Sequence, residues 1–308
     1  MLKRKALKRI GLTTLILFIM LITFSFELMD TKTNNKLEEI EYVSNLNTTH
    51  IYLLNKENYL VKVDILVNKE KIEDMVRYVL KKLYTTNNKY HNLKGLIPSN
   101  TKINKIEYKN DTIIIDFSKD LLAVNKKLEE KVIESIVYTL LEIKGISNIQ
   151  IKIDGKILNK LEKSNITLPD VLDNSLGINK TFNINSLKDI KCVVLYYVFN
   201  NDYNDYYVPV YKYINSKDSK IKIIIDSLNG SYTSNTNLRS YLSYKNSIID
   251  YKLDNDTLTI TFNSLNELNL ESVTYLLSSS VFNTTSDIKK VIFENNKEIV
   301  AIRLSEDK

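Results

Sequence analysis

The sequence is poor in the residues that build metal, disulfide and nucleotide sites. Its 308 residues include one Cys, two His, six Gly, three Pro and no Trp. A disulfide needs two cysteines, and a structural zinc site needs about four Cys or His ligands. No GxGxxG, GxxxxGK[ST], HExxH or GxSxG pattern occurs. We therefore expect no metal, no cofactor and no enzymatic activity.

The remaining composition is that of a globular protein. The chain is 44% apolar and 26% charged, with a formal net charge of +6, and it is long enough for about two domains. Residues 51–160 carry 20 Lys and Arg against 14 Asp and Glu, whereas residues 190–308 carry 13 against 14. No nucleic-acid motif accompanies the basic part. We expect that charge to face anionic envelope polymers, a membrane surface or an acidic protein, and we expect no nucleic-acid partner.

The N-terminus predicts a membrane anchor. Five Lys and Arg residues among the first nine precede an uncharged run from Ile10 to Phe26. The run is long enough for a short span, and no small-x-small cleavage site follows it. Its anchoring side chains are Ile10, Leu15, Leu17, Phe18, Leu21, Phe24 and Phe26. By the positive-inside rule, residues 1–28 form a cytoplasmic tip and signal-anchor helix, and the rest of the chain is extracytoplasmic. A cleaved, secreted form is the alternative, and residues 29–49 are expected to be a tether.

One pattern occurs twice, at an offset of about 145 residues. The segment Asn110–Phe117 aligns without a gap to Asn255–Phe262. Around it, residues 51–54 match 195–198, 60–63 match 207–210, 136–140 match 273–277, and 149–156 match 290–297. A repeat of this length predicts two copies of one domain.

Each copy predicts the order strand, strand, helix, strand, strand, helix, strand. Residues 220–225 alternate like a strand, but Ile221, Ile224, Ile225 and Leu228 also fit a helical spacing, and the repeat favours the helix. The fold class is thus α+β, with helices packed on a mixed sheet in two tandem domains. We expect domains at 50–159 and 190–304, joined by a linker at 160–189 with one short turn.

The motifs of the first copy resemble the GerMN domain family. The resemblance rests on Leu93–Ile103, Ile113–Ser118, Ile136–Ile146 and Ile151–Lys156. Its structural motif residues are Pro98, Asp116, Tyr138, Asp154 and Gly155. The second copy is degenerate: Leu242, Thr261 and Asn296 stand near the places of Pro98, Asp116 and Gly155.

The resemblance implies a GerM-type sporulation and germination protein whose small domains are similar to ring-building motifs. It implies a location between mother cell and forespore, and a scaffold role in a transenvelope complex. Envelope or sporulation channel proteins would be partners, and a homo-oligomer or ring is open. A peptidoglycan-binding accessory protein is the alternative. Related proteins are often lipid-anchored at an N-terminal Cys, which this chain lacks; a transmembrane anchor would serve the same purpose.

Other candidate residues have ordinary structural explanations. Asp116 and Asp154 could act as acid and base, but Asp154 before Gly155 suits a tight turn and Asp116 suits a strand end. His91 lies in a polar loop, and Cys192 lies in an apolar strand where a lone thiol is inert. The tyrosine-rich segment 196–213 is the candidate interface, with Tyr203, Tyr206 and Tyr207 as its contact residues, because tyrosine is enriched at interfaces and also forms strands well.

Overall fold

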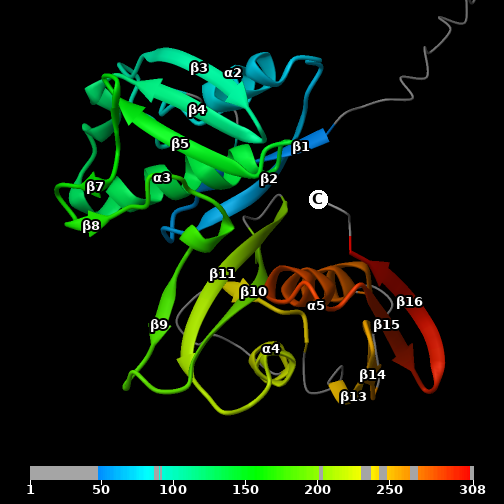
Figure 1. The fold of residues 1–308 in the computed structure, drawn as a ribbon. Helices are drawn as coiled ribbons and strands as arrows, with labels where there is room; N and C mark the ends of the chain where they lie inside the picture. The colour runs from blue at the N-terminus through cyan, green and yellow to red at the C-terminus, as the bar shows by residue number, and fades with distance from the viewer. Residues whose placement is uncertain are drawn as a thin grey trace, which may run out of the picture. The chain divides into compact units, whose positions relative to one another are not determined.

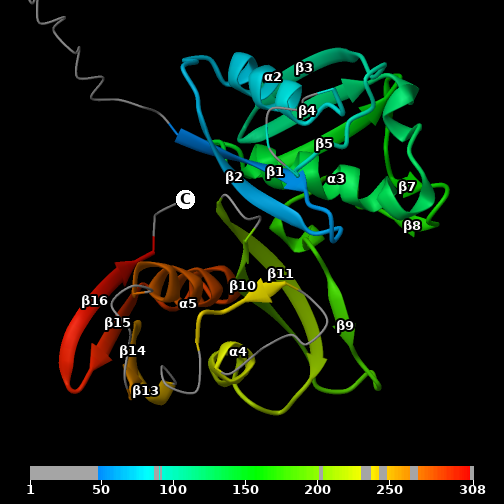
Figure 2. The ribbon, with the colours of Figure 1, turned by 180° about the vertical axis from the view of Figure 1, so that it is seen from behind.

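The computed structural model describes residues 48–86, 90, 92–200, 204–229, 237–242, 248–263 and 270–305 (Figures 1 and 2). All of these residues fall in a single structural unit, Asn47–Lys308. The predicted anchor, most of the predicted tether, His91 and Tyr203 lie outside the described residues. Within the described part of the chain, no helix is long and apolar enough to span a bilayer.

The first repeat is a hairpin, a helix and a four-stranded sheet crossed by a second helix. Its elements are β1 (Thr48–Leu54), β2 (Leu60–Leu66), α2 (Ile72–Lys82), β3 (Ile103–Lys109), β4 (Thr112–Phe117), the 3-10 turn η1 (Lys119–Leu122), α3 (Lys126–Leu141), β5 (Asn148–Ile153) and β6 (Lys156–Ile157). The sheet order is β3-β4-β5-β6, and β4 and β5 are parallel because α3 connects them. The Asn125 side chain caps α3 by accepting from the Leu128 N–H.

The second repeat follows the same order. Its elements are β10 (Ile190–Asn200), β11 (Asp205–Asn215), α4 (Lys220–Leu228), β12 (Leu238–Arg239), β13 (Ile248–Asp254), β14 (Thr257–Phe262), α5 (Leu270–Thr284), β15 (Lys290–Asn295) and β16 (Glu298–Leu304). The sheet order is β13-β14-β15-β16, with β14 parallel to β15. The helix predicted at residues 220–228 is confirmed, and the Ser219 side chain caps it.

Alternating residues of the central strands form the core of each repeat. In β4 the side chains of Ile113, Ile115 and Phe117 are buried, and in β14 Leu258, Ile260 and Phe262 take the same places. Each such side chain contributes about 1.5–3 kcal/mol relative to exposure. Apolar residues therefore alternate along β4 and β14 for the same reason, because one face of each sheet packs on its crossover helix.

The segment between the repeats contains more structure than the single turn we expected. It forms β7 (Lys160–Leu161), β8 (Ile166–Thr167), the 3-10 turn η2 (Asn174–Leu176) and β9 (Thr181–Asn183). β9 runs parallel to β11 through residues Lys212–Ile214. The connection therefore lies along the second repeat's hairpin as an additional strand.

The two hairpins share one sheet, which the sequence pattern did not predict. Its order is β1-β2-β11-β10-β12, with β9 beside β11. β2 of the first repeat pairs antiparallel with β11 of the second, where Lys62 lies opposite Tyr207. Figure 1 shows β2 and β11 meeting where the repeats join.

The structure corrects the alignment of the repeats at two places. The Tyr52 N–H donates to Thr139 Oγ1 at 3.0 Å, and the matching Tyr196 N–H donates to Ser280 Oγ at 2.9 Å. Thr139 therefore corresponds to Ser280, one helical turn from the alignment made by sequence. Similarly, Thr112 lies opposite Asn148 and Thr257 opposite Lys290, which shifts the β5 and β15 alignment by one residue.

Candidate functional site

A buried asparagine fixes the junction of the two repeats. Asn179 precedes β9, and its side chain is 2% exposed. Its Oδ1 accepts from the Leu60 N–H at 2.9 Å, and its Nδ2 donates to the carbonyls of Leu60 and Pro209, each at 2.8 Å. Proline has no N–H to donate to a neighbouring strand. The Asn179 amide therefore bridges β2 and β11 where Pro209 interrupts normal pairing.

Charged groups of α3 hold this asparagine in place. The Glu134 carboxylate accepts from the Asn179 N–H at 3.2 Å and lies 3.0 Å from Lys131 Nζ and 3.1 Å from Lys180 Nζ. Lys131 Nζ also donates to Asn179 Oδ1 at 2.9 Å. A nearly buried carboxylate is stable only when it is paired and hydrogen-bonded, as Glu134 is here.

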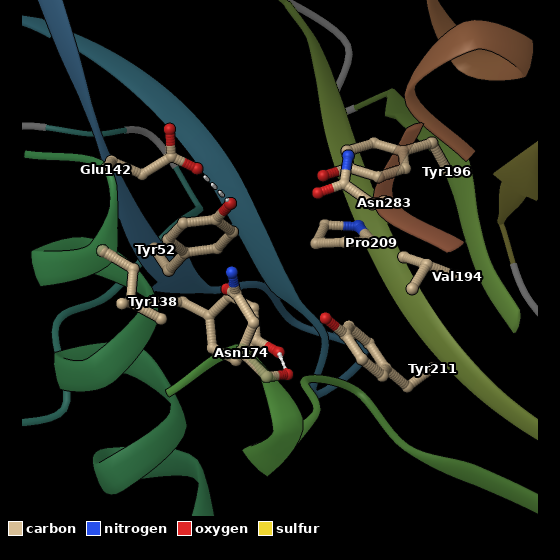
Figure 3. A pocket seen from close by; sticks show the side chains of 10 residues that line it. Tyr52, Tyr138, Glu142, Asn174, Val194, Tyr196, Pro209, Tyr211 and Asn283 are labelled. Atoms are coloured by element: carbon tan, nitrogen blue, oxygen red, sulfur yellow. Dashed lines mark hydrogen bonds between the residues drawn. The ribbon is translucent and has the colours of Figure 1, made fainter. Parts of the chain in front are cut away.

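A second carboxylate, Glu142, lies at the C-terminal end of α3 and gathers groups from β1 and β2. Its Oε2 lies 2.8 Å from His50 Nδ1, and its Oε1 accepts from the Tyr52 hydroxyl at 2.8 Å. Lys62 Nζ lies 3.3 Å from Oε1. Figure 3 shows Glu142 and Tyr52 meeting on one side of the pocket. We call Glu142, His50, Tyr52, Lys62 and Tyr138 the junction cluster.

The junction cluster stabilises the ionised form of Glu142. Burial opposes ionisation, but the hydrogen bond from His50, the charge of Lys62 and the Tyr52 hydroxyl outweigh it and lower the Glu142 pKa to about 2. Burial also opposes the charged form of His50, but Asp64, 3.1 Å from Nε2, and Glu142 together raise its pKa above 6.5. Burial and the neighbouring Glu142 raise the pKa of Tyr52 well above 10.0.

Tyrosines from both repeats line the pocket beside this cluster. The Tyr138 ring lies edge-on to Tyr52, with centroids 5.8 Å apart, and edge-on to Tyr211 of β11 at 6.0 Å. The Tyr138 hydroxyl donates to the Asn174 carbonyl at 2.9 Å. The space that a water molecule can occupy in the pocket is about 20 Å³, and the pocket opens to solvent. Figure 3 shows Tyr196, Asn283, Val194 and Tyr211 on the side opposite Tyr52 and Glu142.

The pocket is lined by the Glu142 carboxylate and by largely buried tyrosines, and the hydroxyls of Tyr52 and Tyr138 already donate to partners within the chain. Burial raises the pKa values of Tyr52, Tyr138 and Tyr196, so these hydroxyls are neutral donors at physiological pH. The two ring nitrogens of His50 both face carboxylates. This arrangement suits polar contact or structural joining of the two repeats. Across the described ranges, no group of three or more His, Cys, Asp or Glu residues has the geometry of a metal site.

The predicted interface tyrosines lie in different environments. Tyr207 is half-buried at the junction, opposite Lys62, and its ring packs on Tyr275 with centroids 4.1 Å apart. Tyr206 is half-buried and packs against the core. Tyr196 and Tyr197 are buried. Contact with another molecule through Tyr203, Tyr206 and Tyr207 stays a prediction, and Tyr207 contributes to the joint between the repeats.

The family-motif residues hold turns and the junction. Asp116 Oδ1 accepts from the Gly155 N–H at 2.9 Å, which ties the end of β4 to the turn after β5. That turn places Asp154 at φ 47° and Gly155 at φ 82°, where glycine is favoured. The Pro98 carbonyl accepts from the Thr101 N–H. Tyr138 is in the junction cluster. Cys192 is half-buried in β10, and burial raises its pKa.

The sequence did not single out His50, Lys62, Asn179 or Glu142. His50 and Glu142 are separated by 92 residues and Leu60 and Asn179 by 119. Such spacing gives no local periodicity. The tyrosine-rich segment was the local signal near this site, since Tyr196 and Tyr211 line one wall of the pocket.

Comparison with known proteins gives consistent matches. Residues 50–159 match the family model described as Germane: sporulation and spore germination. The chain is 25% identical over 239 residues to the spore germination protein GerM of Bacillus subtilis (strain 168), across 76% of this chain. The matched region spans 65% of that relative's length, which is less than two thirds.

The fold matches a solved structure over most of its length. The tandem GerMN domains of the sporulation protein GerM from Bacillus subtilis superpose with a TM-score of 0.69 and 23% sequence identity. The match covers 82% of this chain and 92% of that one. At this identity the match establishes the fold, and it includes both repeats.

Proposed function

We propose that this chain, whose residues 50–159 match the Germane family model and whose fold matches the tandem GerMN domains, is a membrane-anchored extracytoplasmic scaffold of the spore envelope. Its place would be the space between mother cell and forespore, where it supports a transenvelope complex needed for sporulation, germination or both. The N-terminal charge and apolar pattern supports the anchor, since five cationic residues precede the run from Ile10 to Phe26.

The observation that carries the scaffold role is the joint between the repeats. β2 pairs with β11, and the buried Asn179 bridges the same two strands. Interfaces between domains of one chain usually permit relative motion unless they are large and well packed. Here a shared sheet replaces a flexible linker. A fixed pair of domains presents two surfaces at one separation, which suits an assembly protein.

The test is a deletion strain together with a fluorescent fusion in the native organism. We expect the deletion to reduce heat-resistant spores, and the fusion to gather at the membranes around the developing spore. A tagged chain should co-purify with envelope or channel components. Normal numbers of heat-resistant, germinating spores, with the fusion spread evenly over vegetative cells, would refute the proposal.

The pocket supports peptidoglycan binding as a second candidate. Its lining brings Asn174, Asn283 and Glu142 together beside the half-buried Tyr211, and their polar groups can bind sugar hydroxyls. Purified peptidoglycan alone should then retain the full chain. Asn283 is exposed and outside the joint, so Asn283→Ala should weaken retention without unfolding the protein. Equal retention of both chains, or none, would exclude this pocket as the wall-binding site.

A further inference from the structure

The strand β16 is a long free edge, and its counterpart in the first repeat is short. β16 spans Glu298–Leu304, whereas β6, at the same place in the first repeat, spans only Lys156–Ile157. In the described part of the chain β16 pairs with β15 alone and ends the sheet β13-β14-β15-β16. Figure 1 shows β16 as the outermost strand of that sheet. Natural proteins rarely leave a long apolar edge unprotected.

One face of this edge is apolar and exposed. Ile299, Ile302 and Leu304 are 59%, 49% and 67% exposed. They lie opposite Glu294, Ile292 and Lys290, on the outer face of the sheet, while Val291 and Phe293 on the inner face are fully buried. In the first repeat, Gln150 takes the place of Ile292. Ile157, 39% exposed, takes the place of Ile299, so the second repeat extends an apolar strip that the first repeat only begins.

A β-bulge determines which backbone groups of β16 face outward. The Ser305 N–H donates to the Lys289 carbonyl at 2.9 Å, so in this antiparallel pair Arg303 and Ala301 bond to β15 and the backbone of Ile302 and Leu304 points to the free edge. The register shifts between Phe293 and Glu294, which adds one residue to β16. On the N-terminal side of this shift, the backbone N–H and C=O of Ile299 point to the free edge; in a regular strand those of Val300 would do so.

This shift makes the edge complementary to itself. In an antiparallel pair of two β16 strands about a two-fold axis between Val300 and Ala301, Ile299 lies opposite Ile302 of the second copy. Both residues turn their backbone groups outward, so they can exchange hydrogen bonds. Without the bulge, one of them would face away. The apolar strips of the two sheets would also become continuous.

The same register pairs opposite charges. Glu298 lies opposite Arg303 of the second copy, once on each side of the axis. Within its own chain Arg303 bonds through Nη2 to Glu271 Oε1 at 2.7 Å and Thr274 Oγ1 at 3.1 Å. Its Nε is buried and has no acceptor among the described residues. The carboxylate of Glu298 from a second copy would add negative charge beside this guanidinium.

We propose that β16 pairs antiparallel with β16 of a second copy of this chain, joining two four-stranded sheets about an axis between Val300 and Ala301. The partner is a second copy of this chain because the β16 edge is self-complementary. In the antiparallel pair its apolar side chains, its outward backbone groups and its opposite charges each meet their counterparts on the other copy. Two seven-residue edges bury less than the roughly 1,200 Å² of ordinary stable interfaces, so the dimer is weak. The pairing does not depend on the scaffold role.

Register-specific cross-linking tests the pairing. In the full chain, purified in mild detergent with Cys192→Ser, one preparation carries Ile299→Cys and another carries Ile302→Cys. Opposed positions in a hydrogen-bonded pair have Cα atoms about 5.5 Å apart, within disulfide range. Mixed chains should form covalent dimers on mild oxidation about tenfold more than either chain alone. Equal cross-linking of mixed and single preparations, or none, would overturn the proposal.

A matched pair of lysine variants separates the edge from general surface effects. Ile302→Lys places one ammonium group on each side of the axis and should abolish the mixed cross-link between Val300→Cys and Ala301→Cys, the two positions that face each other across the axis. Ile249→Lys changes another exposed isoleucine, 61% exposed against 49% for Ile302, on the opposite edge strand β13, and should leave cross-linking unchanged. Circular dichroism confirms folding of both. Persistence of the dimer in Ile302→Lys would refute the edge as the interface.

Discussion

Glu142 shows how one side chain connects separate elements through charge. It receives His50 and Tyr52 from β1 and Lys62 from β2, at distances of 2.8, 2.8 and 3.3 Å. These contacts favour the carboxylate over the carboxylic acid. The junction cluster is therefore a source of stability that depends on pH, in opposite directions for its two titrating members.

Because of Glu142, the free energy of unfolding should fall as the pH is lowered into the acid range. Its folded pKa of about 2 is below the ordinary 4.5, so its contribution is complete above about pH 4.5 and disappears as the pH falls toward 2. Replacing Glu142 by Gln should cost about 2 kcal/mol near neutral pH and reduce this fall. Urea unfolding from pH 3 to 7 measures it. Glu162→Gln, on an exposed carboxylate, is the control, and an unchanged slope in Glu142→Gln would contradict the assignment.

His50 contributes in the other direction. Its folded pKa is raised above 6.5, so its contribution is complete below about pH 6.5 and is lost as the pH rises through the folded pKa. The native protein should therefore lose a little stability between neutral and mildly alkaline pH, and His50→Gln should remove that loss. The side chain is 31% exposed, so the effect is small.

At the scale of elements, a crossover helix accepts hydrogen bonds from the first strand of each hairpin, from β1 at the edge of the shared sheet and from the part of β10 that β12 does not cover. Thr139 of α3 accepts from the Tyr52 N–H, and Ser280 and Thr284 of α5 accept from the Tyr196 and Val194 N–H groups. Buried N–H groups without acceptors are costly. Both copies therefore use helix hydroxyl groups in place of a neighbouring strand.

Replacing Thr139 by Val tests the hydrogen bond between the Tyr52 N–H and the Thr139 hydroxyl. Valine keeps the shape of threonine but leaves the buried Tyr52 N–H without an acceptor, so the free energy of unfolding should fall by about 2 kcal/mol. Thr259→Val, on the outer face of β14, is the matched control and should change stability by less than about 0.5 kcal/mol. Equal effects of the two substitutions in urea titrations would contradict the role of the Thr139 hydroxyl.

The elements were more predictable than their exact alignment. The internal repeat predicted the helix of residues 220–228, where the local pattern also allowed a strand, and the Asp154-Gly155 dipeptide predicted the turn. The register of α3 against α5 was wrong by one turn, since a shift of one turn preserves an apolar stripe. Asn179 and Glu142 could not be predicted, because their partners are 119 and 92 residues away and nothing local requires an asparagine or a glutamate there.

At the scale of the whole molecule, Asn179 determines whether the repeats behave as one body. Replacing Asn179 by Ala removes its bridge between β2 and β11 and leaves buried backbone groups unpaired. Together with the strain of alanine at φ 49°, this should cost about 3 kcal/mol. We also expect the two repeats to unfold separately in this variant, while in the native chain they unfold together. Hydrogen exchange followed by mass spectrometry measures the unfolding of each repeat separately.

A second substitution isolates the side chain from the backbone strain. Asn58→Ala changes an exposed asparagine at φ 65° that makes no bridge between repeats, so it should cost only about 1 kcal/mol and keep joint unfolding. If Asn179→Ala and Asn58→Ala proved equally mild, the bridge would not couple the repeats.

The shared sheet also determines how the protein would respond to a ligand that touches both repeats. Once such a ligand has bound the first repeat, the second is already held at a fixed distance and orientation. The second contact then costs little additional ordering, and its effective concentration is set by the β2 and β11 pair and not by a linker's length. Loosening the pair would weaken binding at both ends at once, without altering either contact surface.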